Sequence, residues 1–247
     1  MRVAAIQFRP DKGNWDGSAR ALCLLIEEAV ARGAQLVVCP EMALTGYLFA
    51  DAAAARQVAE PVRGPTFDRF SALCRQLGCY LVLGYPEEHG GRLYNSALLL
   101  GPDGVLLGNY RKRLLYEADL SWATPGNRPY PLLQTPLGTL AAGICMDLND
   151  DRFIAFLHRN QPRLVAFPTN WIHQGFDIRP YWLQRLGGLP CCFIAANTYG
   201  QEAAGGRVVR FLGRSAILGP DGRTLALAPE QGDAVLVASV SAHAGDG

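Results

Sequence analysis

Three side chains with complementary chemistry, Glu41, Lys112 and Cys145, each follow a run of residues that the sequence predicts to be a strand. A thiol can attack a carbonyl carbon, a carboxylate can carry its proton, and an ammonium can stabilise the negative charge that develops. Together they would hydrolyse an amide. Taken singly, each has a simpler interpretation: a capping carboxylate, an exposed lysine between Arg111 and Arg113, and a buried inert thiol.

The segment around Cys145 fits a nucleophile best. Residues 140–144 are apolar or small and predict a buried strand, and Asn149 or Asp150 can cap a helix whose apolar positions begin at Phe153. Between a strand end and a helix start, backbone N–H groups lack intrahelical partners, which favours a thiolate. The N–H of Met146 is then available as a donor to an oxyanion.

The remaining pattern predicts alternating strands and helices. Strands are expected at 3–8, 36–39, 79–83, 94–100, 105–110, 164–168, 191–195 and 234–240. One helix is expected after a cap at Ser18, ending at Gly33; a second after a cap at Thr66, ending at Gly78; and a third over 180–186. Strand–helix–strand order favours a parallel sheet covered by helices, and ligands bind at the carboxyl ends of such strands.

A short internal similarity indicates two related halves. The segment 96–104, Ser-Ala-Leu-Leu-Leu-Gly-Pro-Asp-Gly, is similar to 215–222, Ser-Ala-Ile-Leu-Gly-Pro-Asp-Gly, and each is followed by further strand-like sequence. Both predict a hairpin. A mixed sheet in each half, packed face to face with helices outside, would fit this pattern, although turn chemistry alone would also explain it.

Composition narrows the class of protein. The 247 residues are 49% hydrophobic and 18% charged with a formal net charge of +1, and no linker divides them, so we expect a single domain over 1–247. No basic stripe indicates a nucleic acid or a membrane as partner, and no apolar run approaches spanning length. Seven irregularly spaced cysteines favour a reduced, cytoplasmic protein without a zinc site. The tail after Val240 is expected to be frayed.

The motifs taken in order resemble the carbon–nitrogen hydrolase (nitrilase) superfamily. They are Pro40-Glu41-x-x-x-Thr45-Gly46-Tyr47, Tyr110-Arg111-Lys112-x-x-Leu115 followed by Thr124-Pro125-Gly126, Gly143-Ile144-Cys145-x-Asp147, and Pro168-x-x-Trp171. The resemblance implies a four-layer α-β-β-α sandwich of two mixed six-stranded sheets, usually paired into homodimers or larger assemblies. It implies a Glu-Lys-Cys triad at Glu41, Lys112 and Cys145, a thioester intermediate, and no metal or organic cofactor.

Many members of this superfamily carry a second glutamate shortly after the lysine. At the corresponding spacing this chain has Asp119, which is one methylene shorter, and Glu117 lies two residues earlier. Either the backbone comes closer to the lysine at Asp119, or Glu117 takes the role.

Within the superfamily, the motifs look most like the branch that deamidates N-terminal Asn or Gln of peptides. Such a substrate carries an α-ammonium group, which Asp147, Asp150 or Asp151 could receive, although acidic residues at a helix start are ordinary caps. A small ω-amide or an N-carbamoyl amine is the alternative substrate. Tyr47, Asn170 and Trp171 are the candidate pocket residues, with core packing as the default interpretation for the aromatics.

Two other classes of function remain open. The fold could serve as a non-catalytic interaction module, but such a protein is expected to have lost a member of the triad. It could be a glutaminase that feeds ammonia to a synthetase, which would need a partner enzyme.

Overall fold

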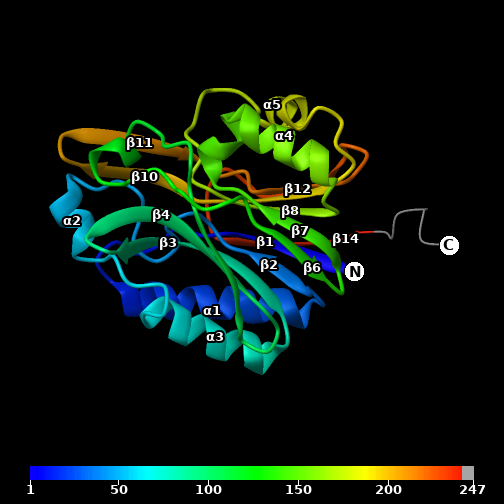
Figure 1. Cartoon of the computed structure of the whole chain (residues 1–247), viewed down its shortest axis with the longest axis horizontal. Helices are drawn as coiled ribbons and strands as arrows, with labels where there is room; N and C mark the ends of the chain where they lie inside the picture. Colours follow the sequence, from blue (N-terminus) through cyan, green and yellow to red (C-terminus); the bar gives the residue numbers. More distant parts are fainter. Residues whose placement is uncertain (241–247) are drawn as a thin grey trace.

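Two six-stranded sheets lie face to face between two layers of helices, and the four layers follow one another from bottom to top in Figure 1. The structure is a computed structural model that describes residues 1–240; the tail expected to be frayed lies outside the described residues. The predicted four-layer α-β-β-α sandwich with two mixed sheets is confirmed.

The first sheet has the strand order β14-β1-β2-β3-β4-β5. Its centre, β1, β2 and β3, is parallel, and its outer strands are antiparallel. The strands are β1 (Arg2–Gln7), β2 (Leu36–Val38), β3 (Tyr80–His89), β4 (Arg92–Leu100), β5 (Leu106–Arg111) and β14 (Ala234–Ser239).

The second sheet repeats this arrangement with the order β13-β12-β9-β8-β7-β6. Here β7, β8 and β9 form the parallel centre. The strands are β6 (Leu132–Thr135), β7 (Gly138–Ala142), β8 (Leu164–Thr169), β9 (Cys192–Asn197), β12 (Ala216–Leu218) and β13 (Thr224–Leu227). Strand β1 contacts β9, and β2 and β3 contact β8, so the two parallel centres face each other.

Alternation along the central strands explains why both faces of each sheet are buried. Val3 and Ala5 of β1 belong to the core between the sheets, whereas Ala4 and Ile6 belong to the core beneath the helices. Strands buried on both faces are continuous apolar runs rather than alternating ones, as the sequence at 3–8 shows.

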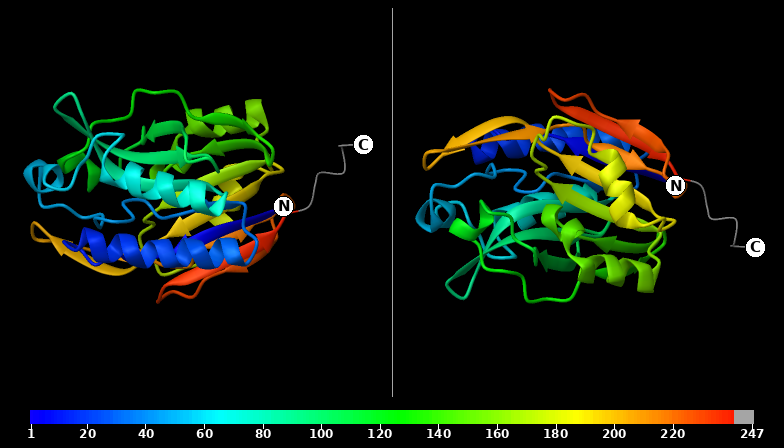
Figure 2. Two further views of the ribbon diagram at one scale, coloured as in Figure 1. Left: turned by 90° about the horizontal axis from the view of Figure 1, so that it is seen from below. Right: turned by 90° about the horizontal axis from the view of Figure 1, so that it is seen from above.

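Helices cover the outer faces. Helices α1 (Trp15–Ala31) and α3 (Pro65–Leu77) lie side by side against the first sheet, and α4 (Asp151–Asn160) and α5 (Arg179–Leu186) lie over the second (Figure 2). The expected ends at Gly33 and Gly78 agree within two residues. The expected caps Ser18 and Thr66 are wrong: Asn14 and Gly64 are the N-caps, because Asn14 already accepts from Gly17 one turn earlier and Pro65 begins α3.

The two similar segments form equivalent hairpins at the edges of the two sheets. In β4–β5, Gly101 donates to Val105 and Gly104 donates to Gly101; in β12–β13, Gly219 donates to Arg223 and Gly222 donates to Gly219. The same turn therefore closes the same edge of each half, and the internal similarity reflects two related halves rather than turn chemistry alone.

A third hairpin, β10 (Tyr199–Ala204) and β11 (Arg207–Leu212), stands apart from both sheets and was not resolved in the sequence pattern. It projects at the same end of the molecule as the short helix α2 (Ala52–Arg56) (Figure 1). Two 3₁₀ turns, η1 (Asp119–Ser121) and η2 (Cys145–Asn149), complete the elements.

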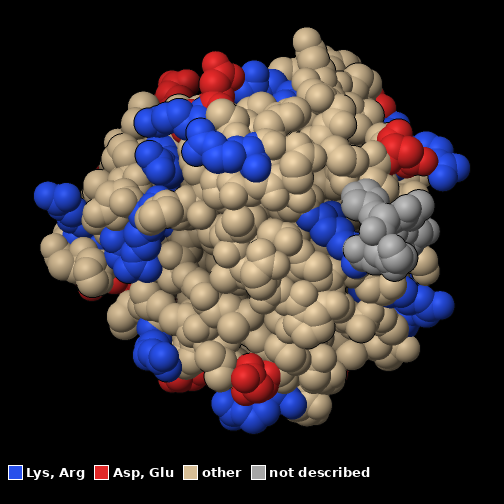
Figure 3. All heavy atoms as spheres, turned by 45° about the vertical axis from the view of Figure 1, so that its right-hand side comes forward, with Lys and Arg blue, Asp and Glu red and all other residues tan. Residues whose placement is uncertain are grey.

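One face of the molecule has a largely uncharged centre. On the face in Figure 3, Lys and Arg gather at the upper left and along the margin, with a few Asp and Glu among them. Within residues 1–240, none of the helices has both the length and the apolar character that crossing a membrane requires.

Candidate active site

Glu41 follows the carboxyl end of β2, where the chain passes very close to β3. Gly84 of β3 donates to Pro40 at 3.1 Å, and a Cβ on Gly84 would lie 2.5 Å from the Glu41 Cα. Only glycine permits this approach. Met42 has a positive φ of 50°, which is costly for a residue with a side chain. The sequence thus turns the chain sharply and directs Glu41 into the interior, where it is 1% exposed.

Lys112 follows the last residue of β5 and is fully buried. Its backbone N–H donates to Asn95 on β4 at 2.8 Å, and its carbonyl accepts from Gly126 at 2.8 Å. A Cβ on Gly126 would lie 2.1 Å from the Arg111 carbonyl oxygen, so glycine is required there too. The lysine backbone is therefore fixed on both sides, and its Nζ donates to Glu41 at 2.8 Å.

Cys145 follows β7 and opens the turn η2, with a φ of +44°. A positive φ is unfavourable for a residue with a Cβ, and the surroundings must hold it in place. The helix predicted to follow begins only at Asp151, with Asp150 as its N-cap, so η2 separates Cys145 from α4. Its side chain is 6% exposed.

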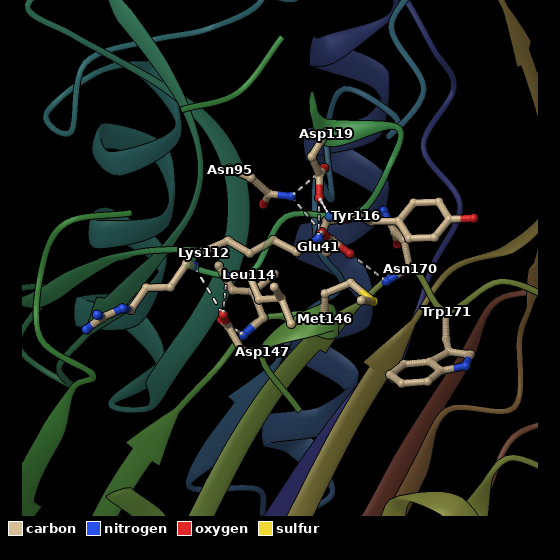
Figure 4. A network of polar contacts seen from close by, with 12 residues as sticks. Glu41, Asn95, Lys112, Leu114, Tyr116, Asp119, Met146, Asp147, Asn170 and Trp171 are labelled. Atoms are coloured by element: carbon tan, nitrogen blue, oxygen red, sulfur yellow. Dashed lines mark hydrogen bonds and ion pairs between the residues drawn. The ribbon is translucent and has the colours of Figure 1, made fainter. Parts of the chain in front are cut away.

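The carboxylate of Glu41 is held at a fixed position by three neighbouring residues. One oxygen accepts from Asn95 Nδ2 at 2.6 Å and from Lys112 Nζ at 2.8 Å, and the other accepts from the backbone N–H of Asn170 at 2.8 Å. The side-chain amide of Asn170 also donates to the Glu41 carbonyl at 2.8 Å. Figure 4 shows these side chains converging from separate elements.

Electrostatics in the cluster keep the proton on the sulfur. Burial, with the nearby charge of Glu41, raises the pKa of the Cys145 thiol to about 12, although Lys112 opposes the shift. Burial disfavours the Lys112 ammonium, but the carboxylates of Asp119 and Glu41 outweigh it and raise its pKa. Burial raises the pKa of Glu41, with Lys112 opposing. The resting nucleophile at neutral pH is therefore a thiol that lies near Glu41 and the Lys112 ammonium.

Asp119, and not Glu117, reaches Lys112. Asp119 is fully buried in η1, and its Oδ2 accepts from Lys112 Nζ at 2.6 Å and from the N–H of Tyr116 at 2.9 Å. Glu117 is exposed to solvent. The aspartate side chain is one methylene shorter than a glutamate, and the 3₁₀ turn compensates because it brings the Asp119 backbone closer to Lys112.

Asp147, Asp150 and Asp151 are engaged elsewhere. Asp147 is fully buried and accepts from the N–H groups of Arg113, Leu114 and Ile144 and from the Tyr110 hydroxyl (Figure 4). It fixes the turn around Cys145 to the segment after Lys112.

Asp150 caps α4 and pairs with Arg152, and Asp151 pairs with Arg185 at 2.8 Å. In this structure, the carboxylates near the nucleophile that were expected to receive an α-ammonium group therefore have protein partners.

A cavity of about 490 Å³ opens above Cys145. It is lined by Tyr47, Tyr116, Cys145, Met146, Asn149, Asn170, Trp171, Ile172, Gln174, Phe176 and Tyr181. Tyr47, Asn170 and Trp171, predicted as pocket residues, and Met146, predicted to supply an oxyanion donor, all lie in its wall, whereas Asp147, predicted to bind the substrate, does not line it. The walls are largely aromatic, which is typical of a site for a small molecule.

Sequence reasoning missed two polar residues that hold the site together. Asn95 binds both Glu41 and Asp119 from inside β4, and a buried amide in an apolar strand was an available signal. Glu202 of β10 accepts from the N–H groups of Tyr47 and Leu48 and pairs with Lys12 at 3.3 Å. It fixes the loop after Glu41, and since the β10–β11 hairpin was not predicted, nothing pointed to it.

Comparison with known proteins agrees with this geometry. The carbon–nitrogen hydrolase family model matches residues 2–245. A nitrilase from Pyrococcus abyssi is 29% identical over 98% of this chain and 90% of its own length. A protein N-terminal amidase from Saccharomyces cerevisiae is 27% identical over 70% of this chain but only 45% of its own length.

Among solved structures, an amidase from Nesterenkonia sp. AN1 carrying acrylamide added at its active-site cysteine superposes with a TM-score of 0.84. It is 23% identical over 98% of this chain and 93% of its own, a level at which the likeness concerns the fold.

Proposed function

The chain belongs to the carbon–nitrogen hydrolase family and is a hydrolase of carbon–nitrogen bonds other than peptide bonds, and from this premise we propose that it hydrolyses amides through a thioester on Cys145. The observation that carries the proposal is the hydrogen bond from Lys112 to Glu41 beside the only cysteine that lines the cavity described above. The thiol lines a cavity of small-molecule size, and Glu41 and Lys112 lie beneath it, near enough to act on its proton electrostatically.

In the first step, Glu41 takes the proton of the Cys145 thiol as the sulfur attacks the amide carbonyl carbon. The pKa of the thiol is too high for Cys145 to be a thiolate before the substrate binds. The proton therefore moves to Glu41 while the sulfur attacks the carbonyl carbon. Two of the three N–H groups of Lys112 bind Glu41 and Asp119, which leaves the third for the oxyanion. Glu41 then gives its proton to the leaving nitrogen, the C–N bond breaks, and ammonia or an amine departs.

In the second step, Glu41 takes a proton from water as the water oxygen attacks the thioester carbon. The C–S bond breaks, the sulfur regains its proton, and a carboxylic acid is released. Asn95 and the N–H of Asn170 keep the same Glu41 carboxylate in place through both half-reactions. Asp119 acts through Lys112, whose charge and orientation it maintains.

The test is direct. The protein is incubated with primary amides, peptides with N-terminal Asn or Gln, N-carbamoyl amines and nitriles, while released ammonia is measured. Intact-mass analysis after acid quenching should show an acyl group on Cys145, absent in Cys145→Ala. If no compound of the panel releases ammonia and Cys145 stays unmodified, the proposal is refuted. Deamidation of an N-terminal Asn or Gln stays a prediction that this panel decides.

We further propose that the protein works as a homodimer or larger assembly in the cytoplasm, without a metal or organic cofactor. All seven cysteines are free, which suits a reducing compartment. Light scattering measures the assembly. Full activity after dialysis against a chelator is the expected result for a reaction that uses only side chains.

A further inference from the structure

The cavity above Cys145 has uncharged walls, and this feature bears on the choice of substrate. None of its lining residues is Asp, Glu, Lys, Arg or His. Ionisable groups do lie beneath it, in the cluster of Lys112, Glu41 and Asp119, but these are bonded to one another. A charged substrate would therefore leave water without meeting a partner of opposite charge in the wall.

Three acidic residues near the cavity, Asp147, Glu202 and Asp177, already have protein partners. Asp147 is saturated by three backbone N–H groups and a hydroxyl. Glu202 accepts from Tyr47 and Leu48, and Asp177 is paired with Arg179 at 2.6 Å. An ammonium group in the cavity would meet aromatic faces and neutral amide side chains, whose attraction is weaker than that of a carboxylate.

A carboxylate on the substrate would fare worse. The buried cluster beneath Cys145 contains two carboxylates and one ammonium, so it does not attract an anion. Two nearby arginines are engaged as well: Arg185 binds Asp151 and the Leu148 carbonyl, and Arg207 binds the Phe49 carbonyl.

Apart from the neutral amides of Asn149, Asn170 and Gln174, most of the wall is apolar or aromatic. The rings of Trp171 and Tyr181 lie 6.0 Å apart at 53°, and Phe176 and Ile172 extend the same wall toward the surface. Both polar side-chain atoms of Asn149 have a protein partner: its Oδ1 accepts from the Tyr181 hydroxyl, and its Nδ2 donates to the Met146 sulfur at 3.2 Å. This wall can bury an acyl group that is itself apolar.

One wall residue, Asn170, keeps an unpaired side-chain oxygen. Asn170 is 3% exposed and lines the cavity, and its Oδ1 has no hydrogen-bond partner within the described chain, while its Nδ2 is fixed on the Glu41 carbonyl. An unpaired buried acceptor selects a ligand that brings a donor. The N–H groups of a primary carboxamide are such donors, whereas a nitrile has none.

From these observations, and resting on the proposed amide hydrolysis, we infer that the substrate is a neutral primary carboxamide with an apolar, branched or aromatic acyl group. The acyl chain lies against Trp171, Tyr181 and Phe176, and the amide nitrogen lies by Asn170 Oδ1. An ω-amide with a free carboxylate, an aminoalkyl carbamoyl compound and a peptide with an N-terminal α-ammonium group are all poor substrates.

The test compares four compounds of similar length: 3-phenylpropanamide, succinamate, 5-aminopentanamide and 3-phenylpropionitrile. We expect kcat/KM for the neutral amide to exceed that of either charged amide by at least about 10²-fold, because an unpaired buried charge is costly. The ratio should change little with salt, since buried charges are weakly screened. The nitrile should be turned over at least about tenfold more slowly than the amide.

Two variants distinguish the effect of a charge in the cavity wall from the effect of a change in the net charge of the protein. Asn149→Asp places a carboxylate in the wall and keeps the acceptor for Tyr181; it should raise the ratio of the cationic to the neutral amide at least about tenfold. Gln134→Glu makes the same change in net charge on the exposed edge strand β6 and should leave that ratio unchanged.

Preferred turnover of a charged amide by the unmodified protein overturns the inference while leaving amide hydrolysis intact. The inference is also overturned if the ratio of cationic to neutral amide turnover is the same in Asn149→Asp as in Gln134→Glu. Absence of ammonia and of thioester with every compound overturns the proposed function itself.

Discussion

The substitution Glu41→Gln separates two roles of this carboxylate. As a proton carrier Glu41 promotes attack, but as a negative charge it raises the pKa of the Cys145 thiol. The glutamine is nearly isosteric, yet one of its ends must place an NH₂ group against either the Asn170 N–H or the donors of Lys112 and Asn95. One buried donor is then unpaired, which lowers stability by about 1–3 kcal/mol.

Amide hydrolysis should fall by about 10²–10⁴-fold in kcat/KM, equivalent to about 3–5 kcal/mol, because general acid–base catalysis is lost. Alkylation of Cys145 by iodoacetamide should respond in the opposite direction. Removing the Glu41 charge leaves Lys112 to lower the pKa of the thiol, so more thiolate is present at a given pH. We expect the rate at pH 8 to rise at least about tenfold.

The assay is the pH dependence of alkylation, followed by intact mass from pH 6 to 10, in parallel with ammonia release. Asp119→Asn is the matched control: it also removes a negative charge beside Lys112, but it does not take the thiol proton. Its alkylation profile should shift less than that of Glu41→Gln. Alkylation of Glu41→Gln that is unchanged or slower at pH 8, or amide turnover within tenfold of the unmodified protein, would refute the assignment.

Three further changes test how the site is held. Glu202→Gln removes the charge that binds the N–H groups of Tyr47 and Leu48, and should raise KM at least about threefold with a smaller change in kcat, measured by steady-state kinetics. Gly84→Ala forces the chain away from Glu41 and should lower stability by about 1–3 kcal/mol in a urea titration, with reduced kcat. Glu87→Gln leaves Arg111 buried without its partner and should cost about 3–5 kcal/mol in the same titration.

The pKa of the Glu87 carboxylate also predicts how the stability of the protein depends on pH. Burial opposes its ionisation, but hydrogen bonds from Arg111, Ser96 and Asn109 hold its pKa below the ordinary value of 4.5. A depressed pKa in the folded state contributes stability above pH ~4.5, and this contribution is lost as the pH falls through the folded-state pKa. The stability lost between pH 6 and pH 4 should be smaller in Glu87→Gln. An equal loss in both proteins would contradict this account.

Much of the fold was predictable because its signals are local. The runs at 3–8, 36–39 and 164–168 are apolar on both faces, and only a helix-covered parallel sheet buries such strands on both sides. The two Gly-Pro-Asp-Gly turns placed hairpins at equivalent edges. The β10–β11 hairpin was missed because its exposed and half-buried residues carry little apolar periodicity, and its turn depends on Gly205 and Gly206 at positive φ.

For the site, residue types at strand ends identified the reactive side chains, whereas their supports were invisible. Nothing in the sequence shows that Asp147 is consumed by backbone N–H groups, since its role depends on a segment more than thirty residues away. The choice between Asp119 and Glu117 depended on the 3₁₀ turn that contains Asp119. The difference of one methylene between the two side chains was not enough to decide it from the sequence. Long-range contacts set both answers, and local pattern carries no information about them.

The catalytic cluster lowers the stability of the fold, and the burial that causes this also determines how the cluster reacts. Three ionisable side chains, Glu41, Lys112 and Asp119, are removed from water, and Cys145 and Met42 adopt positive φ. Such a group persists only because neighbouring strands over-determine it, through Asn95, Gly84 and Gly126. The same burial keeps the proton on sulfur until an amide carbonyl arrives to receive the developing charge. A resting thiol of this kind is protected from solvent oxidants, since the reactive thiolate forms only as the C–S bond is made.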